Sequence, residues 1–171
     1  EEGIKIKAVC GTSIGAINGA LIAQGDFEKC FEMWCNISPK QLFDIEDRHM
    51  ANVLTRNINL KTISYFSSEA KKIISNRGID SENLRKVVDD LVDEDKLRKS
   101  SMDFGLVTVE LGSLSPIELF KEDIPKGKLK DYIMASARYP GLKMDPLDGK
   151  TYLDGGIYDN CHVNLLTKKK L

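Results

Sequence analysis

Histidine, long apolar runs and an excess of either charge are all scarce in this sequence. His49 and His162 are the only histidines among 171 residues, so there are few choices for a histidine base. The 25 basic and 26 acidic residues give a net charge of -1. This balance argues against the basic field expected of a protein that binds nucleic acid or an anionic membrane. No apolar run approaches the ~18 to 20 residues needed to span a bilayer.

The four cysteines form no metal or disulfide pattern. Cys10, Cys30, Cys35 and Cys161 include no C-x-x-C pair, and the second and third fall on one expected helix without metal-ligand spacing. We therefore expect ordinary buried thiols, no bound metal and no cofactor. No signal peptide is visible, and we expect a soluble, cytoplasmic protein.

A serine between two glycines stands near the start, where an extended run turns into a helix. Residues 4–9 alternate as a strand does, and residues 16–23 fit only a helix. Between them lies Gly11-Thr12-Ser13-Ile14-Gly15. A strand, a sharp turn and a helix form a nucleophile elbow, which predicts Ser13 as an exposed nucleophile.

The residues around this serine suit acyl transfer. We expect Gly11 and Gly15 to omit side chains where the backbone turns tightly and the helix approaches its strand. The helix directs unpaired amides and the positive end of its dipole towards the reacting centre. The amide of Ile14 is therefore the predicted oxyanion donor.

Strand and helix patterns alternate along the rest of the chain, with helices dominating the middle. The helix at 27–36 should bury one face bearing Phe27, Cys30, Phe31 and Trp34. Further helices are expected at 67–75, from 80 or 81 onwards, and at 129–137, with strands at 104–111, 117–120 and 152–153. Residues 41–64 show no clear period and predict short helices or a flap. This pattern predicts an α/β fold with a mostly parallel sheet covered on both faces.

A nucleophilic serine needs a base, and the residues leave two choices open. His162 could serve in a serine, aspartate and histidine triad, with Asp145, Asp148 or Asp154 orienting it. Alternatively, Asp154 could take the serine proton directly. Two glycines follow it, and they leave room for a substrate or another backbone.

Three segments together resemble the patatin-like phospholipases. They are Gly11-Thr12-Ser13-Ile14-Gly15-Ala16-Ile17-Asn18-Gly19-Ala20, Ala135-Ser136-Ala137-Arg138-Tyr139-Pro140-Gly141, and Tyr152-Leu153-Asp154-Gly155-Gly156-Ile157-Tyr158-Asp159-Asn160. The resemblance spans about residues 5–163. It implies a three-layer α/β/α domain with a mostly parallel central sheet. It also implies a catalytic dyad of Ser13 and Asp154, with Gly155 and Gly156 completing the second motif.

The resemblance implies hydrolysis of phospholipid or other lipid esters through an acyl-enzyme, without a metal or a histidine. The expected partners are a lipid ester substrate and a transient membrane surface, with no nucleic acid. The family carries a glycine-rich oxyanion loop some thirty residues before its serine, and only twelve residues precede Ser13. We therefore expect a single domain over residues 1–171, truncated at both ends. Two alternatives remain: an α/β-hydrolase-type esterase using His162, and a non-catalytic remnant that binds lipid or protein.

Overall fold

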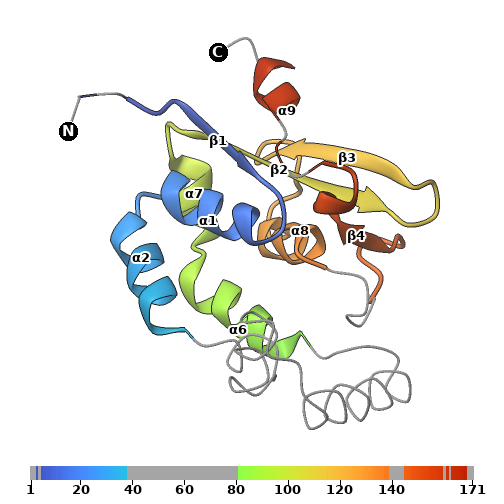
Figure 1. The fold of residues 1–171 in the computed structure, drawn as a ribbon, viewed down its shortest axis with the longest axis horizontal. Coiled ribbons are helices and arrows are strands. Elements are labelled where there is room, and N and C mark those ends of the chain that lie inside the picture. The colour runs from blue at the N-terminus through green and yellow to red at the C-terminus, as the bar shows by residue number, and fades with distance from the viewer. Residues whose placement is uncertain are drawn as a thin grey trace, which may run out of the picture.

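The structure of the protein, a computed structural model, describes residue 3 and residues 5–37, 81–138, 145–159, 161 and 163–168. Figure 1 shows a small twisted sheet with helices packed around it. The described elements, in chain order, are β1 (Ala8–Gly11), α1 (Ile14–Ala23), α2 (Phe27–Asn36), α6 (Glu82–Leu91), α7 (Glu94–Lys99), β2 (Asp103–Glu110), β3 (Ser115–Phe120), α8 (Leu129–Ser136), β4 (Tyr152–Asp154), the 3₁₀ turn η1 (Gly155–Ile157) and α9 (Val163–Lys168).

Strand β2 is the centre of the sheet, and every pairing in the described sheet involves it. β3 pairs antiparallel with residues 105–110 and so occupies one edge of β2. β1 pairs parallel with residues 103–106, while β4 pairs antiparallel with residues 108–110. Because β3 occupies the first edge, β1 and β4 must share the other edge. They run towards each other along it.

Helices cover both faces of this sheet. A Cβ added to Gly19 of α1 would lie 3.3 Å from the Phe104 ring, and one added to Gly105 would lie 3.0 Å from Leu165 of α9. Successive strand residues point to opposite faces, so α1 and α9 pack on opposite sides of β2. Helix α8 lies on the α1 side, where its Ala135 carbonyl is 3.3 Å from Thr108 Oγ1.

The predicted α/β class, with helices on both faces, is therefore confirmed. Among the described strands the sheet is mixed rather than mostly parallel, because only the β1 and β2 pair is parallel. The reason is local. A short turn joins β2 to β3 as a hairpin, and β4, which follows β3 through α8, runs in the same direction as β3 and therefore antiparallel to β2.

Helix α1 is apolar around most of its circumference, as expected of a helix enclosed by protein. Its small residues allow a close approach to β1 and β2, and Ala16 and Ala20 are fully buried. Gly25 has φ 86° and directly follows the C-cap residue Gln24. A left-handed glycine at this position is the usual way to end a helix.

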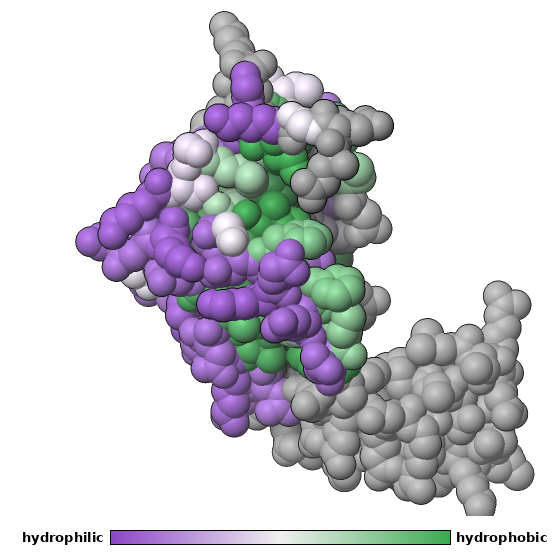
Figure 2. All heavy atoms as spheres, turned by 90° about the vertical axis from the view of Figure 1, so that its left-hand side faces the viewer, coloured by the Kyte–Doolittle hydropathy of each residue, from purple (hydrophilic) through white to green (hydrophobic). Residues whose placement is uncertain are grey.

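Helix α2 has the predicted bounds but not the predicted buried face. Cys30 is buried, and Trp34 Nε1 donates a 2.7 Å hydrogen bond to Asn18 Oδ1 of α1. Phe27 and Phe31 are instead exposed, at 58% and 60%. Figure 2 views the molecule from this side, where hydrophilic side chains cover much of the described surface and apolar side chains show between them.

The remaining predictions divide between confirmed and missed elements. The helices beginning at Glu82 and Leu129 and the strand at Tyr152 form as expected, whereas α7 and α9 were not predicted. The flap at 41–64 and the helix at 67–75 lie outside the described residues.

Cys30 is buried, but Cys35 and Cys161 are exposed, contrary to the expectation of buried thiols. No helix in the described ranges is long and apolar enough to cross a bilayer.

Candidate active site

Ser13 lies at the turn between β1 and α1, in a conformation that few residues adopt. Its backbone has φ 57° and ψ -132°, a region that normally belongs to glycine. Such a conformation costs on the order of 1–3 kcal/mol and persists only where the surroundings impose it. The turn is closed by the Gly15 N–H, which donates to the Thr12 carbonyl at 2.8 Å, and by the Ala16 N–H, which donates to the Ser13 carbonyl at 2.9 Å.

The two glycines of the elbow have different roles. A Cβ on Gly11 would lie 2.0 Å from the Gly15 carbonyl oxygen, so no side chain fits there. A Cβ on Gly15 would meet nothing within 4 Å among the described residues. The expected close approach of helix to strand therefore explains Gly11 but does not explain Gly15.

Asp154 ends β4 and is buried, with 4% of its surface exposed. Its Oδ1 accepts a 2.7 Å hydrogen bond from the N–H of Gly156, the second residue of η1. A Cβ on Gly155 would lie 2.3 Å from both Thr12 Oγ1 and the Val107 carbonyl oxygen. The Asp-Gly-Gly segment therefore packs directly against the residue that precedes Ser13.

The elbow and the end of β4 meet at one point on β2. Gly11 is paired with Leu106, and Asp154 is paired with Thr108, so the two pairings are two residue steps, or about 7 Å, apart along β2. Val107 lies between them. Strand register thus brings together two motifs that lie far apart in the sequence.

The Val107 carbonyl joins the elbow to helix α8. It accepts hydrogen bonds from Thr12 Oγ1 at 3.1 Å and from Ser136 Oγ at 2.6 Å. Ser136 Oγ in turn accepts the Ser13 N–H at 3.1 Å. The Ser13 amide is therefore occupied. The Ile14 N–H has no acceptor within the described part of the chain, and it begins α1, where the helix dipole favours negative charge.

Proximity of the two motifs does not yet amount to a hydrogen-bonded pair. No hydrogen bond joins Ser13 Oγ to the Asp154 carboxylate, although both residues are described. The hydrogen bond that the Asp154 carboxylate accepts from Gly156 is at Oδ1, and no described residue donates one to Oδ2. Catalytic hydrogen bonds are often long in free enzymes and shorten when substrate binds.

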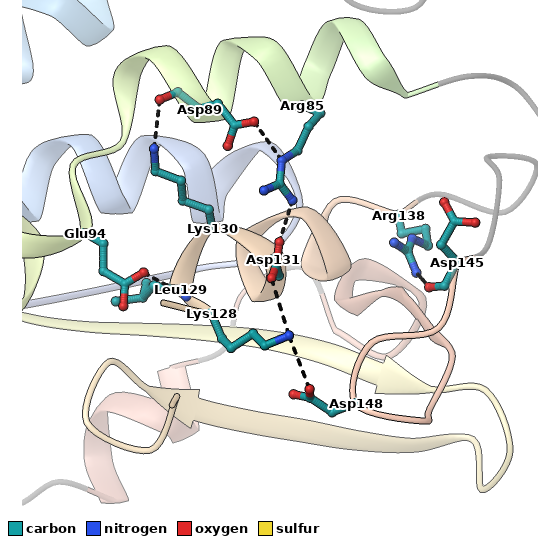
Figure 3. A network of polar contacts seen from close by, with 10 residues as sticks. All are labelled: Arg85, Asp89, Glu94, Lys128, Leu129, Lys130, Asp131, Arg138, Asp145 and Asp148. Carbon is teal, nitrogen blue, oxygen red and sulfur yellow. Dashed lines mark hydrogen bonds and ion pairs between the residues drawn. The ribbon is translucent and has the colours of Figure 1, made fainter. Parts of the chain in front are cut away.

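The alternative triad would use His162 together with one of three aspartates. His162 lies outside the described residues. The Asp148 carboxylate is 3.4 Å from Lys128 Nζ, at the start of α8 (Figure 3). Ser136, which contacts the elbow, ends the same helix, about 12 Å away along its axis. The contact of Asp148 with Lys128 therefore lies at the opposite end of α8 from Ser136.

Arg138 lines an open cleft of about 470 Å³ between α6, α8 and residues 145–147. Its guanidinium donates a 2.5 Å hydrogen bond to the Asp145 carbonyl (Figure 3). Burial lowers the pKa of Arg138, against the opposing effect of Asp145. Elsewhere, no cluster of three or more histidine, cysteine or acidic side chains suited to a metal occurs among the described residues.

Two hydroxyl residues near the site make contacts that the sequence does not reveal. One is Ser136, which lies in a motif quoted above for the family resemblance. The other is Thr108, whose buried Oγ1 donates to the Leu153 carbonyl at 2.8 Å. A hydroxyl that binds a distant carbonyl leaves no periodic signal in the sequence. The motif around Ser136 was a clue to its importance, and Thr108 lies in none of the quoted motifs.

Comparison with known proteins gives a match at the level of a family. No curated protein matches the chain. The model of the family described as patatin-like phospholipase matches residues 1–167, nearly the whole sequence. The chain therefore belongs to the patatin-like phospholipase family, and this membership implies lipid acyl hydrolase activity.

Proposed function

We propose that this protein hydrolyses carboxylic esters of lipids with Ser13 as nucleophile and Asp154 as general base. The observation that carries the proposal is the approach of β1 and β4 along one edge of β2, which ends at the elbow and at Asp154. Family membership supplies the substrate class. A membrane or micelle surface presents such substrates, and we propose transient contact with it.

Acylation begins when Ser13 Oγ attacks the ester carbonyl carbon. Asp154 removes the hydroxyl proton as the new C–O bond forms, and the carbonyl oxygen becomes an oxyanion. The Ile14 N–H donates a hydrogen bond to that oxyanion, assisted by the dipole of α1. Collapse of the intermediate breaks the ester bond, and the departing alkoxide takes the proton from Asp154.

Deacylation repeats this chemistry with water. Asp154 removes a proton from a water molecule while the water oxygen attacks the acyl carbon. This attack forms a second oxyanion, which again accepts a hydrogen bond from the Ile14 N–H. The Ser13–acyl bond then breaks, and Ser13 recovers its proton from Asp154. The products are a lipid alcohol, released first, and a free fatty acid.

The test is covalent labelling with a fluorophosphonate probe, followed by turnover of a p-nitrophenyl ester and a phospholipid. The wild-type protein should take the probe at Ser13, and Ser13→Ala should not. Asp154→Asn should lower kcat by about 10²- to 10⁴-fold, because it removes the base. His162→Ala should leave kcat within about twofold of wild type, as expected for a residue outside the reaction.

Two results would contradict the proposal, and each favours a different alternative. Loss of turnover in His162→Ala, with Asp154→Asn active, would favour the triad. A folded wild-type protein that neither takes the probe nor hydrolyses either ester would favour a non-catalytic lipid- or protein-binding role. Cooperative thermal unfolding establishes that each variant is folded.

A further inference from the structure

Ser136 is a fully buried residue whose hydroxyl joins three elements of the fold. It ends α8, donates a 2.6 Å hydrogen bond to the Val107 carbonyl of β2, and accepts a 3.1 Å hydrogen bond from the Ser13 N–H. Both hydrogen-bonding directions of the hydroxyl are therefore in use. A buried hydroxyl with its donor and acceptor roles both committed fixes the groups that it binds.

The group fixed on the elbow is the amide of the strained residue itself. Ser13 holds φ 57° only while its neighbours impose that angle. The Gly15 and Ala16 amides restrain the carbonyls of Thr12 and Ser13, whereas Ser136 restrains the Ser13 N–H. Ser136 is thus the described side chain that holds the amide of the proposed nucleophile.

The same end of α8 also holds the strand that carries Asp154. The Arg138 carbonyl accepts the Asp154 N–H at 2.8 Å. Thr108 Oγ1 lies 2.8 Å from the Leu153 carbonyl and 3.3 Å from the Ala135 carbonyl. Residues 135–138 therefore contact both motifs, one through Ser136 and the other through backbone groups.

We infer that Ser136 is a positioning residue that sets the direction of the Ser13 side chain relative to Asp154. The inference rests on the proposed function, because it assigns Ser136 a part in that reaction. Loss of the hydroxyl frees the Ser13 amide and lets the elbow relax. The nucleophile is then misdirected, although substrate can still bind.

The chain offers a matched control. Ser100 Oγ donates to the Ala23 carbonyl at 2.5 Å and accepts the Met102 N–H at 3.1 Å. Ser136 makes contacts of the same two kinds, one donated to a carbonyl and one accepted from an N–H. Those of Ser100 lie at the opposite end of α1 from the elbow. Ser100→Ala and Ser136→Ala therefore remove equivalent hydrogen bonds, and one of them lies at the site.

The experiment compares wild type, Ser136→Ala and Ser100→Ala by fluorophosphonate labelling, steady-state kinetics and amide hydrogen exchange at Ser13. In Ser136→Ala, kcat and the labelling rate should fall by about 10- to 100-fold with KM nearly unchanged, since small misplacements of reacting groups have effects of this size. Exchange at the Ser13 amide should accelerate about tenfold. Ser100→Ala should match wild type in all of these.

If Ser136→Ala does not fold, Ser136→Cys serves in its place, because a thiol fills the space of the hydroxyl, being somewhat larger, but is a weak donor and acceptor. Wild-type labelling rates in the Ser136 variant, or an equal fall in both alanine variants, would overturn the inference. If wild type itself takes no probe, the proposed function fails first. Exchange at the Ser13 amide then decides separately whether Ser136 holds the elbow.

Discussion

At the scale of single residues, the backbone around Ser13 shows which parts of the motif are structural. Gly11 is required because the Gly15 carbonyl occupies the place of any side chain. Gly15 has neither a crowded Cβ position nor a positive φ among the described residues. Within a helix, glycine is about 1 kcal/mol less favourable than alanine. Gly15 therefore reduces the stability of α1 while leaving space beside the nucleophile.

A pair of alanine substitutions separates these two glycines. Gly11→Ala should lower the free energy of unfolding by several kcal/mol or prevent folding, because the new methyl overlaps backbone atoms. Gly15→Ala should raise it by up to about 1 kcal/mol. Urea denaturation measures both. Equal stability of Gly11→Ala and wild type would contradict the geometry of the elbow.

At the scale of elements, α7 shows what a six-residue helix can contribute. The Arg98 guanidinium donates to the carbonyls of Lys121, Ile124 and Pro125 at 2.7–2.9 Å. Lys121 Nζ donates to the carbonyls of Leu97, Ser100 and Met102 at 2.6–3.3 Å. Two cationic side chains thus satisfy the carbonyls where α7, β2 and β3 converge.

Removing the buried ammonium should destabilise this junction. Lys121 is 4% exposed, so Lys121→Met keeps the apolar stem but leaves buried carbonyls without their donor. We expect the free energy of unfolding to fall by about 2–3 kcal/mol. Lys130→Met is the control, because its surface hydrogen bond to the Asp89 carbonyl should be worth less than about 0.5 kcal/mol. Similar losses in both variants would contradict this.

Glu94 makes the α7 junction sensitive to acid. Burial raises its pKa, but the Arg98 guanidinium and the amides of Gly127 and Leu129 together hold it below the ordinary value of 4.5. A lowered pKa in the folded state adds stability above pH 4.5, and that stability is lost as the pH falls towards the folded pKa.

Glu94→Gln isolates this effect. The variant should be less stable than wild type by about 1–2 kcal/mol near pH 7, and the difference should shrink as the pH falls below 4.5. Denaturant unfolding between pH 3 and 7 measures it. A stability difference that does not change with pH would show that the charge is not responsible.

Elements with a clear apolar period or a distinctive motif could be predicted from sequence, and the rest could not. Helices α6 and α8 and strand β2 are long enough for a repeating pattern. Helix α7 is too short for one, although Asp93 caps it by accepting the Lys96 N–H. The face of α2 was mispredicted because packing follows Trp34 and its hydrogen bond to Asn18, and apolar spacing does not reveal that bond.

The residues of the site also divide into those that the sequence predicts and those that it does not. Ser13 and Asp154 could be proposed because each lies within a recognisable local motif. The contact from the Ser13 amide to Ser136 spans 123 residues and depends on how α8 packs. No spacing rule predicts such a contact. The ion pair between Asp148 and Lys128 is likewise a contact of tertiary packing that spacing does not predict.

At the scale of the whole molecule, the near balance of charge bears on how a lipid surface is met. The net charge is -1, with acidic and basic residues in nearly equal number. Figure 2 shows hydrophilic side chains spread over the described surface on the α2 side. Electrostatic attraction to anionic lipid headgroups requires a basic cluster, and the composition gives no overall basic excess.

Turnover of a lipid ester in vesicles should therefore depend little on anionic lipid. Raising the anionic fraction from none to about one third should change the rate less than about threefold, and added salt should have a similarly small effect. Rates on zwitterionic vesicles provide the reference. A steep rise with anionic lipid that salt abolishes would indicate a basic docking surface instead.

The shared edge of β2 also determines the order in which the molecule can assemble. The β2–β3 hairpin closes through a short turn, whereas the elbow reaches Val107 across 95 residues and β4 reaches Thr108 across 45. Loops of that length close late, because closing them loses conformational entropy before the new contacts compensate for it. Nearly all of the sheet must therefore be in place before Ser13 and Asp154 first meet. A refolding chain should regain its hairpin well before its activity.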